Sequence, residues 1–146
     1  EMNKAIKCRI IASDIDTSMI DATRENAEIA GGDKIIECDI CDFMMSPVPE
    51  TSERGTIIFN PPYGSRLGDP VHLRNTYADM GAFLEKNRES YDGFIFTGNP
   101  ELTASAGLVA SHSQTFFSGR IECKLLEKPT LTPEAMSLFR RRNLNT

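Results

Sequence analysis

The sequence predicts an α/β fold in which a mostly parallel sheet lies between helices in three layers and closes with an antiparallel hairpin. Three observations support this prediction. Apolar strand-like runs that end in polar residues alternate with longer helix-like stretches along most of the chain. Apolar side chains after residue 69 recur at helical spacing. Near the C-terminus, two strand-like runs at 111–117 and 120–127 are separated only by Ser118 and Gly119, which is typical of a hairpin.

The N-terminal part of the chain is expected to fold as strand, helix and strand. The expected ranges are 7–13 for the first strand, 17–30 for the helix and 34–38 for the second strand. Asp16 or Thr17 can accept hydrogen bonds from the first N–H groups of the helix, and Gly31 with Gly32 can end it. The buried side of the helix is expected to carry Ile20, Ala27 and Ala30.

The remainder of the chain is expected to continue this alternation up to the hairpin. The expected elements are a buried strand at 57–59, a helix from about 70 to 88, a strand at 91–97, a short helix from 100 to about 107, the hairpin, and a helix at 133–142. The long helix is the clearest, because Leu73, Tyr77, Met80 and Leu84 form one apolar stripe at helical period. We interpret this stripe as core rather than as part of a binding site. Asn99 can cap the short helix.

Length and charge suggest one domain and argue against some classes of function. The 146 residues are enough for one core, and we expect a domain over 1–128 followed by a helical tail or linker over 129–146. The formal net charge of −5 argues against nucleic-acid binding by bulk electrostatics, so phosphate contacts would need a local patch or another domain. The sequence has no apolar run near the ~20 residues of a membrane span and no signal-peptide core. A cytoplasmic location is therefore expected.

The cysteines are expected to be reduced thiols that mostly pack in strands as small apolar groups. They are Cys8, Cys38, Cys41 and Cys123. Cys38 and Cys41 have C-x-x-C spacing, but no second pair accompanies them, and the two histidines, His72 and His112, are isolated. Because a zinc site needs about four such ligands, we expect no metal site.

The stretch with the most specific chemistry is Thr56 to Gly64, in which Asn60, Pro61, Pro62 and Tyr63 follow an apolar strand. Proline lacks a backbone N–H and has a restricted φ, so the two prolines end the strand and stiffen a polar loop. Open α/β sheets bind their ligands at the carboxyl ends of strands. The Asn60 amide oxygen and the Pro61 carbonyl oxygen are two acceptors that suit a planar NH2 group. Tyr63 offers a ring on which a base could stack.

This stretch resembles the (Asp/Asn)-Pro-Pro-(Tyr/Phe) motif of S-adenosylmethionine-dependent amino-methyltransferases, which methylate exocyclic amines of adenine or guanine, or a glutamine amide. The longer string from Asn60 to Leu67 resembles the RNA methylase family that includes the bacterial 23S rRNA guanine-N2-methyltransferases and the THUMP-domain tRNA guanine-N2-methyltransferases. That family usually has an acidic residue where Ser65 stands. The resemblance extends from about Ile10 to Glu127. It implies a Rossmann-like class I methyltransferase fold, S-adenosyl-L-methionine as cofactor, and an enzyme that methylates guanine N2 in ribosomal or transfer RNA.

The resemblance also implies residue roles. Asp14 and Asp16 follow the first expected strand, and capping alone explains such a pair in most proteins. By similarity to the family's cofactor segment, the Asp14 carboxylate would bind the ribose hydroxyls and Ile15 would lie near the adenine ring. Asp39 would accept a hydrogen bond from the adenine N6 amine, with Asp42 as the alternative. The implied catalytic residues are Asn60, Pro61, Pro62 and Tyr63, and Asn60 is also expected to border the cofactor.

The family's glycine-rich loop has no counterpart in the sequence. No Gly-x-Gly precedes Asp14, so the first strand, its loop and its helix are expected to lie outside this chain, as is the family's THUMP RNA-binding domain. Strands beside the missing one would have unpaired edges. We therefore expect a piece of a longer enzyme that binds cofactor poorly and is inactive alone. The alternatives are an adenine-N6 DNA methyltransferase, a protein-glutamine methyltransferase, a dinucleotide-binding Rossmann domain, and a non-catalytic RNA-binding module.

Overall fold

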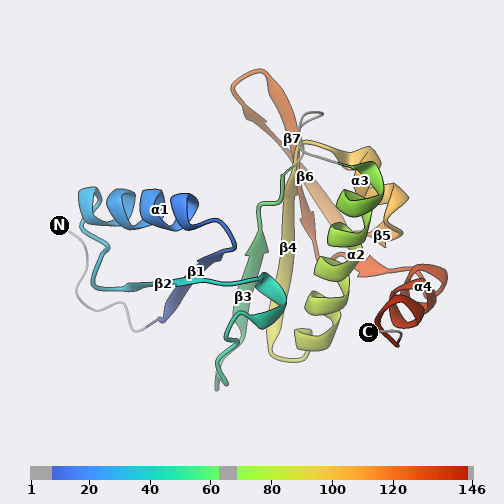
Figure 1. Cartoon of the computed structure of the whole chain (residues 1–146), viewed down its shortest axis with the longest axis horizontal. Coiled ribbons are helices and arrows are strands. Elements are labelled where there is room, and N and C mark those ends of the chain that lie inside the picture. The colour runs from blue at the N-terminus through green and yellow to red at the C-terminus, as the bar shows by residue number, and fades with distance from the viewer. Residues whose placement is uncertain (1–7, 63–68, 145–146) are drawn as a thin grey trace. The chain divides into compact units, whose positions relative to one another are not determined.

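The structure is a computed structural model that describes residues 8–62 and 69–144. The chain forms two compact units, residues 1–49 and residues 50–146, which are called the N-terminal unit and the C-terminal unit below. Both units contain helices and strands, which alternate along the chain up to residue 109 (Figure 1). This order confirms the predicted α/β class.

The N-terminal unit is a parallel strand–helix–strand arrangement. Its elements are β1 (Ile10–Asp14), α1 (Thr17–Ile29), β2 (Ile36–Ile40) and the 3-10 helix η1 (Phe43–Met45). β1 and β2 pair in parallel, with Ile10 opposite Ile36. Ile20 and Ala27 of α1 are buried, at 1% and 7% exposure, because residues seven apart lie on one side of a helix.

Three expectations for the N-terminal unit are wrong in detail. Asp14 is the last residue of β1 rather than the residue after the strand. β2 begins and ends two residues later than the expected range of 34–38, so Asp39 lies inside the strand rather than after it. Ala30 is exposed, because α1 already ends at Ile29. Gly31 then turns the chain at a φ of 72°, in the left-handed region that glycine favours.

The C-terminal unit contains a four-stranded sheet with one antiparallel hairpin. The elements of this unit are β3 (Gly55–Phe59), α2 (Pro70–Asn87), β4 (Tyr91–Thr97), α3 (Pro100–Ser105), β5 (Leu108–Val109), β6 (His112–Ser118), β7 (Ile121–Glu127), β8 (Thr130–Leu131) and α4 (Pro133–Leu144). The strand order is β3-β4-β7-β6. β3 and β4 are parallel, with Phe59 opposite Ile95, whereas β7 is antiparallel to both β4 and β6. The expected strand at 91–97 and the expected hairpin are both confirmed.

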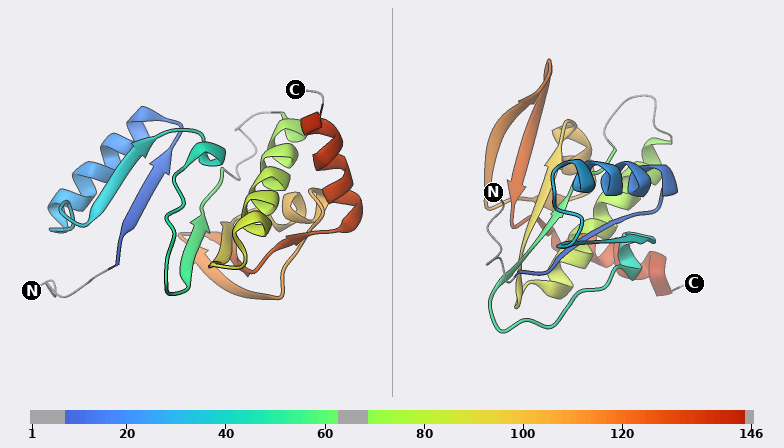
Figure 2. Two further views of the ribbon diagram at one scale, coloured as in Figure 1. Left: turned by 90° about the horizontal axis from the view of Figure 1, so that it is seen from below. Right: turned by 90° about the vertical axis from the view of Figure 1, so that its left-hand side faces the viewer.

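Helix α2 packs on one face of this sheet and supplies much of the core (Figure 2). Tyr77, Met80 and Leu84 are 0%, 4% and 5% exposed, and Ile95 of β4 is fully buried. A Cβ atom on Gly93 would lie 2.8 Å from the Leu84 side chain, so glycine lets α2 approach β4 closely. The apolar stripe on α2 is therefore core, as predicted.

The motif strand β3 is covered on one face only. The Phe59 ring packs edge-on against Phe83 of α2, with centroids 5.9 Å apart, but Ile58 is 63% exposed. The strand that was predicted to be buried is therefore buried on one face only, because alternate side chains of a strand point to opposite faces. Among the residues that the structure describes, β3 pairs only with β4, and β1 pairs only with β2.

The segment after β7 packs within the C-terminal unit. β8 pairs with β5, Leu108 lying opposite Leu131, and the Arg142 guanidinium of α4 binds the Asp79 carboxylate of α2. The division at residue 128 into a domain and a tail stays a prediction. None of the helices in the described ranges is long and apolar enough to cross a membrane.

Candidate active site

The motif loop, defined here as Asn60, Pro61 and Pro62, follows β3 at the carboxyl edge of the sheet. Pro61 is buried, whereas Asn60 and Pro62 are exposed. The Asn60 amide makes no hydrogen bond with the described parts of the chain, so its oxygen is available as an acceptor. The fourth expected catalytic residue, Tyr63, lies outside the described residues.

The hydroxyl groups of two buried residues, Tyr77 and Thr97, support the motif loop from the core. The Tyr77 hydroxyl lies 3.3 Å from the Pro62 carbonyl oxygen and 2.8 Å from the Thr97 hydroxyl. The backbone N–H of Asn99 donates to Thr97 Oγ1 at 3.0 Å. Because Tyr77 gives its one hydroxyl proton to Pro62, it accepts from Thr97, which accepts in turn from Asn99. Hydrogen bonds therefore connect the loop before α3 to the motif loop through the core.

Sequence reasoning placed Tyr77 in the core but missed this contact. Tyr77 and Thr97 are both fully buried, and buried hydroxyls nearly always have hydrogen-bond partners. A tyrosine in an otherwise apolar helical stripe was therefore a signal that a polar partner lies beneath the helix. Asn99 lies two residues after the end of β4 at Thr97. Its side chain accepts from the Leu102 N–H at 3.0 Å and caps α3, as expected.

The expected ribose ligand, Asp14, is the last residue of β1. Its Oδ1 accepts the Asp16 N–H at 2.9 Å, which leaves the other carboxylate oxygen available. Asp16 caps α1, because it accepts from the hydroxyl and the N–H of Ser18 at 2.6 and 2.8 Å. These hydrogen bonds lower the pKa of Asp16. Ile15 is 72% exposed between the two carboxylates, where it could contact a flat apolar ring.

The two candidates for the adenine amine occupy different positions around the end of β2. Asp39 lies inside the strand opposite Ser13, and because residues alternate along a strand, its side chain and that of Asp14 point to opposite faces. Asp42 follows the strand and caps η1 by accepting the Met44 N–H at 2.9 Å. Asp39 makes no hydrogen bond or ion pair with any residue in 8–62 or 69–144, and Asp42 uses only one carboxylate oxygen in its cap, so both carboxylates offer an acceptor.

The expected site residues thus form two sets. Asp14, Ile15 and Asp39 lie at one edge of the β1–β2 pair in the N-terminal unit, and the motif loop lies in the C-terminal unit. The four cysteines are free thiols, and the expectation of no metal site stays a prediction.

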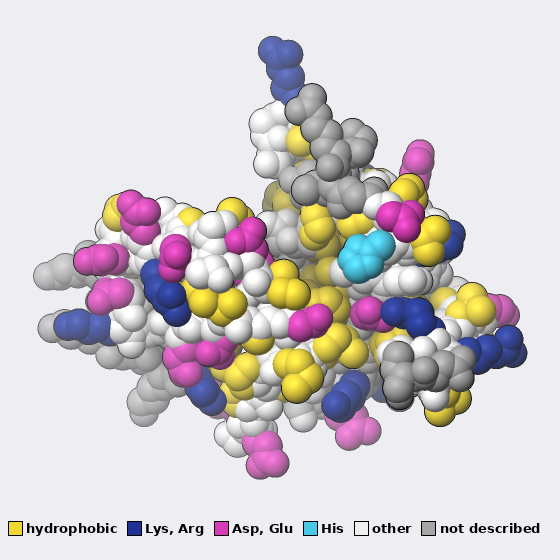
Figure 3. All heavy atoms as spheres, viewed as in Figure 1, with side chains coloured by type: hydrophobic (Ala, Val, Ile, Leu, Met, Phe, Trp, Pro, Cys, Tyr) yellow, Lys and Arg dark blue, Asp and Glu magenta, His cyan; other side chains and the backbone are white. Residues whose placement is uncertain are grey.

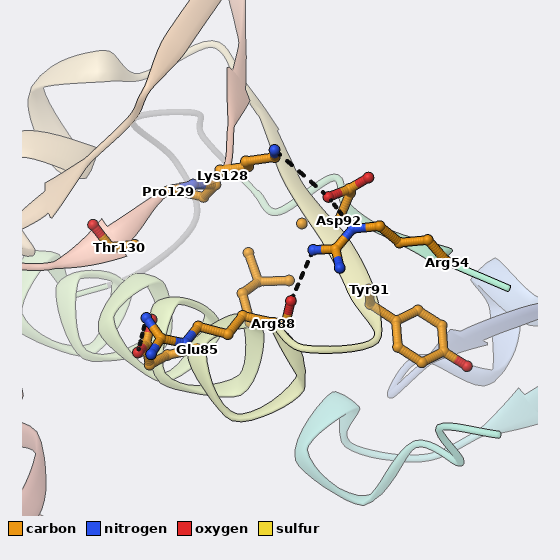
Figure 4. Close-up of a pocket in the computed structure, with 10 residues that line it drawn as sticks. Arg54, Glu85, Arg88, Tyr91, Asp92, Lys128, Pro129 and Thr130 are labelled. Atoms are coloured by element: carbon orange, nitrogen blue, oxygen red, sulfur yellow. Dashed lines mark hydrogen bonds and ion pairs between the residues drawn. The ribbon is translucent and has the colours of Figure 1, made fainter. Parts of the chain in front are cut away.

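A second polar cluster lies at the other end of β4, away from the motif loop (Figure 4). Arg54 Nε donates to Asp92 Oδ1 at 2.8 Å, and the other Arg54 nitrogens donate to the carbonyl oxygens of Arg88 and Glu89. Lys128 Nζ lies 3.8 Å from the same Asp92 oxygen. The hydrogen bond from Arg54 lowers the pKa of Asp92. These groups border a cavity of about 240 Å³ but largely pair with one another, so we interpret them as a clasp between the start of β3 and the α2–β4 turn.

The strand order, the terminal antiparallel hairpin and the Asn-Pro-Pro turn after β3 define the class of protein as a class I methyltransferase fold. Two solved structures agree. SMU.472, determined in complex with SAH, superposes with a TM-score of 0.74 at 23% identity over 86% of this chain and 32% of that chain. A protein from Clostridium difficile 630, described as "a possible methylase", superposes with a TM-score of 0.69 at 31% identity over 86% of this chain and 32% of that chain.

The family follows from the sequence match. Residues 1–127 match the family model UPF0020, RMKL-like, methyltransferase domain, and the chain belongs to this family. The protein named Ribosomal RNA large subunit methyltransferase K/L from Syntrophotalea carbinolica is 38% identical over 119 residues. That match covers 80% of this chain but only 17% of the relative's length. This chain therefore spans about a sixth of the curated relative that it matches.

Proposed function

We propose that the protein is an S-adenosyl-L-methionine-dependent N-methyltransferase that acts on guanine N2 in ribosomal RNA. One observation carries this proposal: in a member of the methyltransferase family, Asn60 and Pro61 follow β3 at the carboxyl edge of the sheet, and the Asn60 amide makes no hydrogen bond within residues 8–62 and 69–144. The name of the Syntrophotalea carbinolica relative, a ribosomal RNA methyltransferase, supports RNA as the substrate.

The motif loop is suited to hold an exocyclic amine. The Asn60 amide oxygen and the Pro61 carbonyl oxygen each accept one N–H of the amine, which orients the nitrogen lone pair away from the ring system. Tyr63 stacks on the base, and Tyr77 keeps Pro62 in place through the core. Holding the amine in the correct orientation for attack supplies much of the rate acceleration in a reaction of this kind.

The N-terminal unit offers residues that fit the cofactor. The second Asp14 carboxylate oxygen would accept from the ribose hydroxyls, and the exposed Ile15 side chain would cover the adenine ring. The adenine amine would donate to Asp42, which follows β2, or to Asp39, which points to the opposite face from Asp14. When bound, S-adenosyl-L-methionine supplies a methyl group on a positively charged sulfur. By similarity to the family motif, Asn60 would contact the cofactor as well as the target amine.

The RNA partner and the location follow from the same proposal. Because the chain carries a net charge of −5, it has too little positive charge to hold a polyanion by itself. A further RNA-binding domain therefore provides most phosphate contacts in the cytoplasm, and the target guanine is flipped out of its stack into the site.

Product analysis tests the proposal. The complete protein is incubated with methyl-labelled cofactor and, in separate reactions, 23S rRNA, tRNA, DNA and a glutamine-containing protein, because adenine N6 and the glutamine amide are also planar amines. We expect label in rRNA as N2-methylguanosine, identified by mass spectrometry of nucleosides. Label in adenine or protein would overturn the guanine assignment, and no transfer to any substrate would overturn the methyltransferase assignment.

A further inference from the structure

The β6–β7 hairpin ends in an exposed apolar and basic tip that the site described above does not use. Phe116, Phe117 and Ile121 of this tip are 44%, 70% and 48% exposed. Arg120 makes no hydrogen bond or ion pair with any part of the chain that the structure describes. Phe116 and Ile121 share one face of the hairpin and Phe117 lies on the other. Single exposed apolar residues are common on protein surfaces, but apolar side chains on both faces of a projecting tip, with a cation that is unpaired within the described residues, suit an interaction site.

The tip stands at the same edge of the sheet as the motif loop. β4 ends at Thr97, which pairs with Lys124, whereas the hairpin continues for three more residue pairs, up to Ser118 and Ile121. Three strand residues span about 10 Å, so the tip projects by about that length beyond β4 (Figure 1). The hairpin strands lie two and three strand spacings from β3, or about 10–14 Å. This offset places the tip beside the target position rather than at it.

The tip is a tight turn, and one of its aromatic rings is uncovered. Gly119 has a φ of 61° at the first central position of a two-residue turn, as in a type II′ hairpin. The Phe116 ring packs against Phe96, with centroids 6.2 Å apart. Phe117 points to the other face, where its cross-strand partner Glu122 pairs with Lys124 at 3.1 Å. The backbone of Phe117 is therefore fixed by pairing with β7, while its ring is exposed and can contact a ligand.

We propose that the hairpin tip, residues 116–121, binds RNA next to the target nucleotide. The Phe117 ring stacks on an unpaired base, and the Arg120 guanidinium binds a neighbouring phosphate. This inference rests on the proposed function, since it takes RNA as the substrate. It is supported by charge: the chain has a net charge of −5, so RNA needs a local cation. Arg120 has no ion-pair partner among the described residues, whereas Lys124 pairs with Glu122. An aromatic ring beside a cation is a common arrangement for holding single-stranded nucleic acid.

The test compares RNA binding by the complete protein and its variants. The probe is a fluorescent stem-loop of 23S rRNA, and its anisotropy gives the affinity at several salt concentrations. The double variant Phe117→Ala/Arg120→Ala is expected to bind about tenfold more weakly. Its plot of log affinity against log salt should lose about 0.7 of slope, because one phosphate contact is gone. The variant Phe117→Tyr/Arg120→Lys should stay close to the wild type.

Two controls separate RNA binding from folding. Lys86→Ala removes an exposed cation from the last turn of α2, at the opposite end of the sheet, and should leave RNA affinity unchanged. Affinity for S-adenosylhomocysteine should be equal in all variants. Phe117 and Arg120 are exposed, so their loss leaves the core intact.

The outcomes distinguish this inference from the proposed function. Equal RNA affinity of the alanine variant and the wild type overturns the inference, even where methyl transfer to RNA is intact. Weaker binding by the alanine variant supports it, even where the wild type transfers no methyl group and the proposed function fails. An altered oligomeric state with unchanged RNA affinity shows that the tip contacts a second copy, which overturns it. A wild-type protein that binds no RNA overturns both.

Discussion

Single side chains determine how well the motif loop is held. Asn60 and Pro61 carry the proposed chemistry, but the loop itself is fixed by a hydroxyl from a distant helix. Tyr77 reaches Pro62 across 15 residues of sequence and Thr97 across 20. Since both residues are fully buried, the loss of either hydroxyl removes one hydrogen bond from its partner in an apolar surrounding.

Tyr77→Phe tests this connection, because it removes one hydroxyl and keeps the ring. We expect the free energy of unfolding to fall by about 1–3 kcal/mol, as measured by urea denaturation. We also expect kcat for methyl transfer to fall about tenfold, since a loosened loop orients the amine less well. Tyr91→Phe, at the first residue of β4 and the opposite edge of the sheet, is the matched control. An unchanged kcat for Tyr77→Phe would mean that the loop keeps its shape without this bond.

Substitutions of Asp14 and Asp16 should have different effects, one on cofactor binding and the other on the stability of α1. Asp14→Ala removes a carboxylate with a free oxygen, so the dissociation constant of S-adenosylhomocysteine should rise about tenfold or more. Asp16→Ala removes the cap of α1, so it should lower Tm with little effect on affinity. Isothermal titration and thermal melts of the complete protein measure the two effects. An affinity loss confined to Asp16→Ala would contradict the assignment of Asp14.

For single residues, the sequence predicted hydrogen bonds to nearby residues but not those to residues far away in the chain. Asp16 as a cap and Asn99 as a cap were predictable, because both accept N–H groups two or three residues away. The contact of Tyr77 with Pro62 was not, because helical periodicity shows that a side chain is buried without showing what it meets.

Helices and strands were predictable where they are long or sharply ended. The expected strand at 91–97 coincides with β4, and the hairpin follows from its glycine turn. β5 and β8 were missed because each has two residues, too few for any periodicity. The range predicted for β2 began and ended two residues too early, because the short mixed sequence of this strand marks neither of its ends. This displacement matters for the site, because it puts Asp39 within the ladder.

The clasp at the far end of β4 should make stability depend on pH. Hydrogen bonding from Arg54 lowers the pKa of Asp92 in the folded protein below its ordinary value of 3.8. The ionised Asp92 carboxylate therefore stabilises the fold above pH 3.8, and this stabilisation is lost as the pH falls through the lowered pKa of the folded state. Asp92→Asn should therefore be less stable than the wild type at pH 7, and the difference should vanish at acid pH. Thermal melts from pH 7 to pH 2 measure this. A difference that is constant with pH would contradict the ion pair.

The whole chain divides into two units with different parts of the proposed chemistry. The candidate cofactor residues lie in residues 1–49 and the candidate catalytic residues in residues 50–146. Basic and acidic side chains are interspersed on the surface shown in Figure 3, in keeping with the modest net charge of −5. The sequence predicted one domain over 1–128 because composition shows no break at residue 49. The division depends on which strands pair, which the sequence alone does not determine.

The C-terminal unit should fold independently, since its sheet, α2 and the β5–β8 ladder share one core. A protein of residues 50–146 should give a dispersed amide spectrum, with the slowest hydrogen exchange in β4 and β7 at the centre of the sheet. A collapsed, poorly dispersed spectrum would contradict the division into units.

The most direct test of the central claim is a comparison of methyl transfer and cofactor affinity in Asn60→Ala. The claim is that Asn60 holds the target amine, so labelled methyl transfer from the complete protein to rRNA should fall by about 100-fold or more. The dissociation constant of S-adenosylhomocysteine should stay nearly unchanged, and Asn60→Asp, which keeps an acceptor, should retain part of the rate. Equal losses of transfer and cofactor affinity, or transfer at the wild-type rate, would contradict the claim.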